Sequence, residues 1–280
     1  MPVSVGEALQ AARLRLRAAS KNPRRDAELL LAHLLGCDRV DLAAHPERLL
    51  SPSEADHFES LIRRRLANEP VQYMTGVQEF FGLPFEVSPA VLIPRPETEH
   101  LVEAVLERLN QESELRIVDV GTGSGAIAVA LAHALPRSQV TAVDLSPAAL
   151  EVAHRNAQRH GVAVRVTFLH SDLLAAVDGT DFDAVVSNPP YIAEGEVLEP
   201  QVTNYEPHSA LYAGPAGLEI YERLIPQAAR VLKPQGWLML EIGYGQRPAV
   251  QYLLADWTGV TFLNDLQAIP RVVVAKRSVR

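Results

Sequence analysis

The segment of this sequence best suited to chemistry on a planar NH2 group is Asn188-Pro189-Pro190-Tyr191. Neither proline has a backbone N–H, so the main chain around them offers only carbonyl acceptors. The side-chain oxygen of Asn188 adds another acceptor, and Tyr191 adds a flat face on which an amide or a nucleobase can stack. Two acceptors that hold both hydrogens of an amide nitrogen can turn its lone pair towards an electrophile. The same four residues could instead form an ordinary turn, because Asn-Pro and Pro-Pro often interrupt loops.

A glycine-rich segment upstream indicates a nucleotide-like ligand. An apolar strand from Ile117 to Val120 leads into Gly121-Thr122-Gly123-Ser124-Gly125, and a helix is expected from Ala126 to Ala134. This order of strand, turn and helix holds ligands at the carboxyl end of a strand, where glycine lets them approach the backbone. The spacing G-x-G-x-G differs from the dinucleotide fingerprint G-x-G-x-x-G, so the loop alone is weak evidence.

Two carboxylates follow the next two expected strands. Asp144 lies 19 residues beyond Gly125, where it can accept hydrogen bonds from both ribose hydroxyls of an adenosine. Asp172 follows a strand predicted over residues 164–170, and with Leu173 it would flank the adenine. Each carboxylate also has a simpler interpretation, since Asp144 could be a solvated strand end and Asp172 a turn residue.

Together these motifs resemble those of class I S-adenosylmethionine-dependent methyltransferases that act on planar amino groups. More narrowly, the chain resembles the release factor glutamine methyltransferases, the HemK or PrmC family. The narrower resemblance also depends on the segments Glu69-Pro70-Val71-Gln72-Tyr73-Met74-Thr75-Gly76, Phe80-Phe81-Gly82-Leu83-Pro84-Phe85, Leu92-Ile93-Pro94-Arg95-Pro96-Glu97-Thr98-Glu99 and Tyr205-Glu206-Pro207 with Ala210-Leu211. The segment from Ile93 to Glu99 is the most specific, whereas Asn-Pro-Pro-Tyr and the glycine loop occur in many amino methyltransferases. Leu173 departs from the pattern, because relatives often carry an aromatic residue there.

The resemblance implies an α/β fold, a seven-stranded, mostly parallel, doubly wound Rossmann-like sheet whose final strand is reversed. It also implies the target, which is N5 of the glutamine in the Gly-Gly-Gln motif of class I peptide chain release factors. The catalytic residues would be Asn188, Pro189, Pro190 and Tyr191, with Asn188 and the Pro189 carbonyl holding the NH2 group. S-adenosyl-L-methionine would contact a larger set, namely Gly121, Thr122, Gly123, Ser124, Gly125, Asp144, Asp172, Leu173 and Asn188.

Two other functions fit part of this pattern. A DNA or RNA adenine or cytosine amino methyltransferase would use the same pocket on a flipped base. The formal net charge of −8 and the pI of about 5.6 argue against a broad polyanion-binding surface, so we expect no direct nucleic-acid binding. Arg63-Arg64-Arg65 is the candidate basic patch, and we interpret it as a solvated helix face. A non-catalytic nucleotide-binding or interaction module is the second alternative, and the intact Asn-Pro-Pro-Tyr segment argues against it.

The chain divides into three predicted parts: a helical domain over residues 1–70, a β-hairpin linker over 71–96 and the methyltransferase domain over 97–280. The helical domain, which includes a capping box at Ser51-Pro52-Ser53-Glu54, could dock the substrate or only stabilise the protein, and the resemblance favours docking. Residues 192–216 are predicted as a long irregular loop that could act as a lid. Within it, Glu206 would lie in solvent or tether the loop rather than act as a base. Arg95 could be a surface cation or a functional residue.

The remaining composition is typical of a cytoplasmic enzyme without membrane contact. The single cysteine, Cys37, excludes an intramolecular disulfide framework and is usual in a reducing compartment. No apolar stretch reaches the roughly 18 residues of a membrane span, and the N-terminus has no basic-then-apolar signal. The histidines show no ligand spacing, so no metal site is expected.

Overall fold

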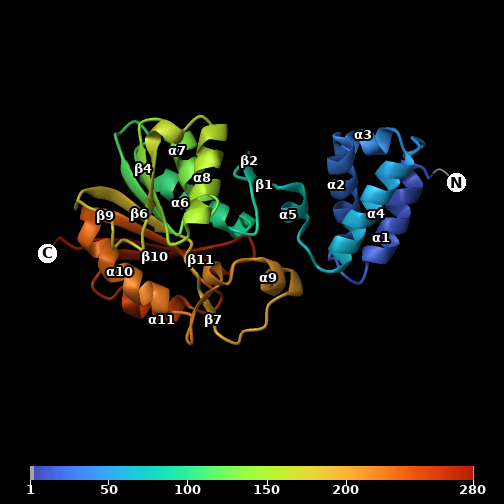
Figure 1. The fold of residues 1–280 in the computed structure, drawn as a ribbon. Helices are drawn as coiled ribbons and strands as arrows, with labels where there is room; N and C mark the ends of the chain where they lie inside the picture. Colours follow the sequence, from blue (N-terminus) through green and yellow to red (C-terminus); the bar gives the residue numbers. More distant parts are fainter. Residues whose placement is uncertain (1–2, 280) are drawn as a thin grey trace. The chain divides into compact units, whose positions relative to one another are not determined.

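The computed structural model describes residues 3–279, which divide into two compact units (Figure 1). The first, which we call the helical unit, extends to Val77 and also includes the distant segment Leu198–Tyr205. The second, which we call the sheet unit, comprises Gln78–Val197 and the chain from Glu206 onwards. The chain therefore leaves the sheet unit after residue 197 and returns to it at residue 206. The predicted domain boundaries at 70 and 96 stay predictions.

The helical unit is built from short helices with defined starts. They are α1 (Val5–Leu16), α2 (Pro23–Leu35), α3 (Arg39–Ala44), α4 (Pro52–Leu66), α5 (Val71–Thr75) and α9 (Pro200–Tyr205). The predicted capping box forms, since the Ser51 side chain accepts a hydrogen bond from the Glu54 N–H at the start of α4. The apolar faces of α1, α2 and α4 bury a small core that includes Leu16, Leu31 and Ile62. The sequence interpretation anticipates neither α3 nor α5.

Arg65 corrects the expectation of a fully solvated Arg63–Arg65 face. Its side chain is buried, with Nε 2.7 Å from the Asp26 carboxylate and Nη2 3.3 Å from Oε1 of Gln201 on α9. Arg63 and Arg64 instead pair with glutamates close to them in the sequence. Burial of a charged side chain requires partners from other helices, which the local pattern of three arginines does not reveal.

The sheet unit contains a seven-stranded sheet in the order β10-β11-β9-β6-β3-β4-β5. Its strands are β3 (Arg116–Val120), β4 (Gln139–Asp144), β5 (Val166–His170), β6 (Phe182–Ser187), β9 (Leu232–Glu241), β10 (Thr258–Asn264) and β11 (Pro270–Lys276). β11 runs antiparallel to both β9 and β10, whereas the pairs among β9, β6, β3, β4 and β5 are parallel. The predicted mostly parallel, seven-stranded α/β sheet with a reversed final strand is therefore confirmed.

Helices cover both faces of this sheet (Figure 1). One face is covered by α6 (Glu99–Arg108), α7 (Ala126–Ala134) and α8 (Pro147–Arg159), and the other by α10 (Glu219–Val231) and α11 (Arg247–Leu253). The sheet and α6–α8 enclose a first hydrophobic core, and the sheet and α10–α11 enclose a second. Successive residues of β3 point to opposite faces, since Ile117 packs into the first core and Val118 into the second. The sheet is therefore buried on both sides, as parallel sheets usually are.

The strand order reverses at β3, which lies between β4 and β6. The glycine loop follows β3, and Asn-Pro-Pro-Tyr follows β6, its parallel neighbour. Loops after adjacent parallel strands meet at one edge of a sheet, and ligands of doubly wound folds bind in the crevice at such a switch point. The topology thus brings together the two segments that the sequence singles out.

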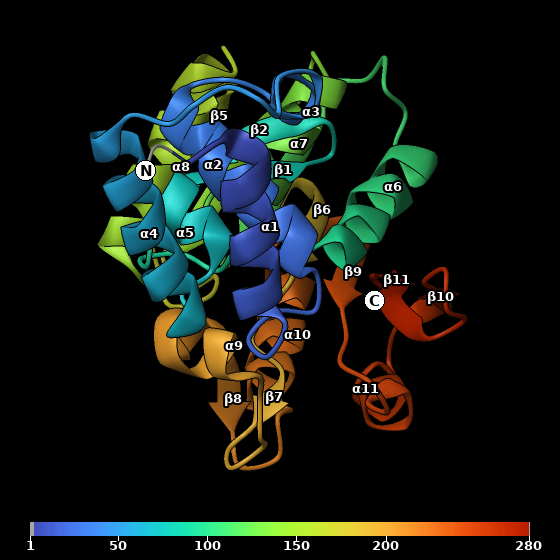
Figure 2. The same cartoon turned by 90° about the vertical axis from the view of Figure 1, so that its right-hand side faces the viewer.

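Smaller elements complete the described chain. They are the hairpin strands β1 (Val77–Phe80) and β2 (Leu83–Glu86), the short pair β7 (Ile192–Ala193) and β8 (Tyr212–Gly214), and the 3-10 helices η1 (Pro96–Thr98), η2 (Ala163–Arg165) and η3 (His208–Ala210). β7 and β8 lie side by side (Figure 2), so the segment predicted as irregular from 192 to 216 has short ordered parts. The sequence predicts a turn at Pro234-Gln235-Gly236 and then a strand from Trp237 to Ile242. β9 instead begins at Leu232, because the expected turn is an irregularity within its pairing to β6. None of the helices between residues 3 and 279 has the length and apolar character of a membrane span.

Candidate active site

A cavity of about 410 Å³ lies in the sheet unit where these loops meet. Its wall comes from the segments after β3, β4, β5 and β6, from residues 90–92, from 207–210 and from the first turns of α10. Eight of the predicted site residues line it, namely Gly121, Gly123, Asp144, Asp172, Leu173, Asn188, Pro189 and Pro190. Their placement at one cavity is a finding, and their individual contacts with a ligand stay predictions.

Two glycines leave the cavity wall open to a ligand. Gly121 and Gly123 have φ angles of 71° and 56°, and no described atom outside each glycine and its two chain neighbours lies within 4 Å of the place where a Cβ would stand. Gly125 has a different role, because a Cβ on it would lie 3.0 Å from the Cβ of Ala153 on α8. Side chains at the first two positions would fill the space that a nucleotide-like ligand needs, whereas one at the third would separate α7 from α8.

Thr122 and Ser124 are buried and are not among the residues that line the cavity. The Thr122 hydroxyl donates to Oδ2 of Asp119 at 2.6 Å, and the Ala128 N–H donates to the same oxygen at 3.2 Å. Burial raises the pKa of Asp119 to about 7, and Oδ1 has no hydrogen-bond partner among residues 3–279. Asp119 thus fixes the glycine loop and the start of α7 through hydrogen bonds from the buried side of the loop. The sequence interpretation gives it no role, although an Asp two residues before the first glycine of the turn is a usable signal.

Asp144 holds the loop from the next strand and also lines the cavity. Its Oδ2 accepts from the Gly123 N–H at 2.9 Å and its Oδ1 from the Ser146 N–H at 2.8 Å. Burial raises its pKa above the ordinary value, and these two backbone donors oppose that shift. A carboxylate has about four acceptor sites, so both oxygens can still accept from ribose hydroxyls.

Asp172 and Leu173 form a further part of the wall. Asp172 pairs with Arg223 of α10, with 2.5 Å between Oδ2 and Nη2, and both side chains are about half exposed. Leu173 has a φ of 51°, a left-handed conformation that is uncommon for a leucine, and it also packs against the second core. An aliphatic side chain at the wall offers an apolar face to a ring.

Asn188 is fixed by side chains from two other elements. Its Nδ2 donates to the Thr98 hydroxyl at 3.0 Å, and Thr98 in turn donates to Oε2 of Glu241 at 2.6 Å. Thr98 ends η1, and Glu241 ends β9. Both are buried, and the sequence interpretation gives neither a role. The signals that could have identified them are the position of Thr98 in the segment from Ile93 to Glu99, and a glutamate at the end of an apolar strand.

Tyr191 packs against the second core and is not among the residues that line the cavity. Its hydroxyl lies 3.3 Å from Oε1 of Glu241, and its carbonyl accepts from Nε2 of Gln246 at 2.9 Å. A Cβ on Gly217 would lie 2.7 Å from that carbonyl, and one on Gly243 would lie 2.9 Å from the Tyr191 ring. Close packing on both sides therefore holds the end of the Asn-Pro-Pro-Tyr segment. The predicted part of Tyr191 in shaping the acceptor pocket stays a prediction.

Glu206 and Arg95 form a partly buried ion pair beside the cavity. One carboxylate oxygen of Glu206 lies 2.5 Å from Arg95 Nη2, and the other accepts from the Ile93 N–H at 3.2 Å. The Glu206 side chain is 1% exposed, so it is not a solvated carboxylate, and its bonds to Arg95 and to the Ile93 N–H attach the loop that carries it. The function of residues 192–216 as a lid stays a prediction. Arg95 is the residue to which Glu206 is tethered.

The doubly wound sheet, with its ligand cavity at the switch point and Asn188, Pro189 and Pro190 at the cavity wall, defines an S-adenosylmethionine-dependent methyltransferase. The fold agrees with solved structures. A ribosomal-protein methylase of Lactobacillus delbrueckii subsp. bulgaricus is 26% identical, with a TM-score of 0.50 over 72% of this chain and 90% of that chain. A 16S rRNA methyltransferase of T. Thermophilus in complex with AdoMet and guanosine is 22% identical, with a TM-score of 0.54 over 72% of this chain and 49% of that chain.

Two family models match the sequence. A model described as the PrmC N-terminal domain matches residues 7–76, and one described as the methyltransferase small domain matches residues 98–205. The release factor glutamine methyltransferase of Koribacter versatilis is 48% identical over 279 residues, which cover 98% of this chain and 99% of that protein. The chain belongs to the release factor glutamine methyltransferase family, and its cofactor is S-adenosylmethionine. The alternative of a nucleic-acid amino methyltransferase is not favoured.

Proposed function

We propose that this enzyme transfers a methyl group from S-adenosylmethionine to N5 of the glutamine in the Gly-Gly-Gln motif of class I peptide chain release factors. The family membership supports a release factor as substrate, and Asn188 at the cavity wall supports an amide as the acceptor. Because release factors act in translation, we place the enzyme in the cytoplasm. The observation that carries the proposal is the side chain of Asn188, held by Thr98 at the wall of a cavity that also contains the two open glycines.

One group of cavity residues suits the cofactor, and another group suits the substrate amide. Gly121, Gly123, Asp144 and Leu173 would hold S-adenosylmethionine, which when bound supplies a methyl group on a positively charged sulfur. Asn188 Oδ1 and the Pro189 carbonyl would accept the two hydrogens of the glutamine amide and orient its nitrogen. Orientation of this kind lowers the barrier without a covalent enzyme intermediate. No strong base is needed, since the amide proton becomes acidic only after methyl transfer.

The direct test is methyl transfer from isotope-labelled S-adenosylmethionine to an intact release factor, with mass spectrometry of the Gly-Gly-Gln peptide. We expect one methyl group on the glutamine and none on a factor whose motif glutamine is replaced by glutamate. Asn188→Ala should slow single-turnover transfer by about 100-fold or more, whereas the exposed Asn264→Ala should not change it. Labelling of duplex or single-stranded nucleic acid in place of the factor would overturn the proposal.

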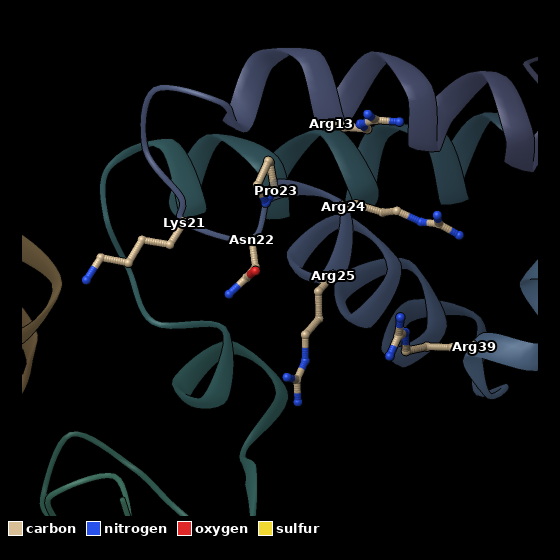
Figure 3. A pocket seen from close by; sticks show the side chains of 7 residues that line it. All are labelled: Arg13, Lys21, Asn22, Pro23, Arg24, Arg25 and Arg39. Carbon is tan, nitrogen blue, oxygen red and sulfur yellow. The ribbon is translucent and has the colours of Figure 1, made fainter. Parts of the chain in front are cut away.

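We further propose that the helical unit docks the release factor. Residues 1–77 contain eleven Lys and Arg against ten Asp and Glu, whereas residues 78–280 contain fifteen against twenty-four. The positive charge gathers at a hollow beside the start of α2 (Figure 3). The hollow is lined by Arg13, Lys21, Asn22, Pro23, Arg24, Arg25 and Arg39. Such a surface suits an acidic patch on a protein partner, because complementary charge accelerates encounter.

The charges of this hollow are only partly neutralised. Arg24 and Arg39 share Glu28, and Lys21 pairs with Glu199. No ion pair joins Arg13 or Arg25 to another residue of the range 3–279. These two arginines are therefore the ones to change, because their replacement breaks no described ion pair.

The docking proposal is tested by comparing two substrates with the double variant Arg13→Ala/Arg25→Ala. We expect kcat/KM for the intact factor to fall about tenfold at low salt, and less at high salt, while transfer to a short Gly-Gly-Gln peptide is unchanged. Arg63→Ala, which removes an exposed arginine from another helix of the same unit, is the matched control. An equal fall for factor and peptide would contradict docking through this surface.

A further inference from the structure

The position of Thr98 indicates a role beyond its own helix. It stands at the N-cap of α6, where the hydroxyl of a threonine usually accepts a backbone N–H of the first turn. Its side chain makes no such capping bond. The hydroxyl instead lies between the side chains of Asn188 and Glu241, which are 90 and 143 residues away in the sequence.

The register of the sheet explains why these side chains meet. Ser187 of β6 is paired with Leu240 of β9, so Asn188, which follows β6, and Glu241, which ends β9, lie at the same level of the sheet. Thr98 then fills the space between them from η1. The three groups form one continuous chain of hydrogen bonds from a buried carboxyl group to the cavity wall.

The donors and acceptors of this chain have only one consistent direction when Glu241 is ionised. A carboxylate only accepts, so the single hydroxyl hydrogen of Thr98 points to Glu241. The Thr98 oxygen then has only lone pairs for Asn188, which must turn its NH2 group towards Thr98. Asn188 Oδ1 is left to accept a hydrogen bond from a ligand. A reversed amide would present two donors to the NH2 group of the substrate and could not bind it.

We propose that Thr98 and Glu241 are positioning residues that keep the oxygen of Asn188, rather than its NH2 group, available to the substrate amide. This inference rests on the proposed function, since it requires an acceptor amide at Asn188. It assigns the orientation of a catalytic side chain to two buried residues that never touch the substrate.

Protonation of Glu241 removes the constraint, because a carboxyl O–H can donate to Thr98 and free the threonine hydrogen for Asn188 Oδ1. Burial raises the pKa of Glu241 to about 7, while the bonds from Thr98 and Tyr191 and the charge of Arg271 lower it and Glu97 raises it again. The hydroxyl of Tyr221 bonds only the Glu241 carbonyl among the atoms of that residue. The constraint on Asn188 thus holds above about pH 7 and is released below it.

The first experiment is a double-mutant cycle with single-turnover rates at pH 8. Thr98→Val keeps the shape of the side chain but removes the hydroxyl, and we expect it to lower kcat by about 10- to 100-fold with little change in KM. Thr98→Ser should restore kcat to within about threefold of wild type. In an Asn188→Ala background, Thr98→Val should have no further effect, since Thr98 acts only through Asn188.

Two further measurements separate positioning from general damage. Calorimetry should show unchanged S-adenosylmethionine affinity in Thr98→Val, and the side-chain NH2 signal of Asn188 in ¹⁵N spectra should shift without any substrate present. Glu241→Gln, which can still accept from Thr98, should remove the fall of kcat below pH 7. Each of three results would overturn the inference: wild-type kcat in Thr98→Val, an independent effect of Thr98→Val in the Asn188→Ala background, or an unchanged acid limb in Glu241→Gln. Absence of transfer by the wild-type enzyme would instead refute the proposed function.

Discussion

Replacement of Arg95 by methionine should loosen the cavity wall by leaving a carboxylate buried. The Glu206 side chain is 1% exposed and would keep only the Ile93 N–H as a partner. Removing one partner of a buried ion pair typically costs about 3–5 kcal/mol. Arg95 itself is 33% exposed, so water can replace part of its contribution, and we expect about 2–3 kcal/mol.

This cost should appear locally rather than as global unfolding, because the segment after Glu206 can move the carboxylate into water. That segment includes Pro207, Ser209 and Ala210, which line the cavity. A ligand that binds only the tethered state loses affinity in proportion to the population of that state. A cost of 2–3 kcal/mol limits the loss to at most roughly 30- to 150-fold, and we expect about tenfold in the Kd of S-adenosylmethionine.

The change in S-adenosylmethionine affinity when Glu206→Gln is added to Arg95→Met tests whether the buried charge causes the loss. Glu206→Gln removes the charge but keeps acceptor and donor atoms, so Arg95→Met/Glu206→Gln should bind S-adenosylmethionine more tightly than Arg95→Met alone. Calorimetry gives the three affinities, and limited proteolysis after residue 206 reports the released segment. The reasoning is refuted when the double variant is as weak as the sum of the single losses predicts, or when Arg95→Met changes neither affinity nor cleavage.

Three further changes test the cavity and its support. Asp144→Ala should weaken S-adenosylmethionine binding by about 1–3 kcal/mol in calorimetry, because a charge-assisted bond to ribose is lost, and an unchanged affinity would remove the ribose assignment. Asp119 has a pKa of about 7 in the folded protein against an ordinary value near 4, so the folded state binds more protons between these pH values and stability falls as pH rises through them. Asp119→Asn should therefore flatten that part of the stability profile measured by denaturant titration. Gly125→Ala should destabilise the protein by more than the roughly 1–2 kcal/mol expected for Gly161→Ala, since both have positive φ but only the first would meet Ala153; equal thermal transitions would contradict this.

The parts of the fold that local patterns encode could be predicted from the sequence. The sequence predicts strands over Gln139–Asp144 and Phe182–Ser187 and a helix over Ala126–Ala134, and β4, β6 and α7 have these bounds in the structure. Apolar runs and the glycines and prolines beside them mark these ends. The short helix α3 lies among mixed residues without a clear apolar period, and its start depends on an Asp38 capping box that the sequence interpretation overlooks. The start of β9 is also not predictable from the local sequence. Pro234 and Gly236 indicate a turn, whereas pairing with β6 and β11 keeps the strand continuous.

The residues of the candidate site also fall into two groups, those that a local pattern reveals and those that only the folded structure reveals. Gly121 and Asn188 can be recognised in the sequence because each begins a motif directly after an apolar strand. Asp144 can be recognised because it ends the next strand at a known spacing from the glycine loop. Thr98 and Glu241 cannot be recognised in this way, since their hydrogen bond joins residues 143 positions apart and exists only after the sheet has formed. A local pattern holds no information about such a partner.

The discontinuous helical unit has a consequence for how this protein is made. The helices up to α5 leave the ribosome first, but α9, which supplies Gln201 to Arg65 and the Tyr205 hydroxyl to the Ala67 carbonyl, follows more than a hundred residues later. At roughly 5–20 residues per second, that interval is on the order of 10 s. For that time Arg65 has Asp26 as its side-chain partner but lacks Gln201, and the surface beside α4 is incomplete. The last step in assembling the first-made unit therefore awaits a segment encoded within the second, and a fragment that ends at residue 77 would represent the nascent intermediate rather than the finished unit.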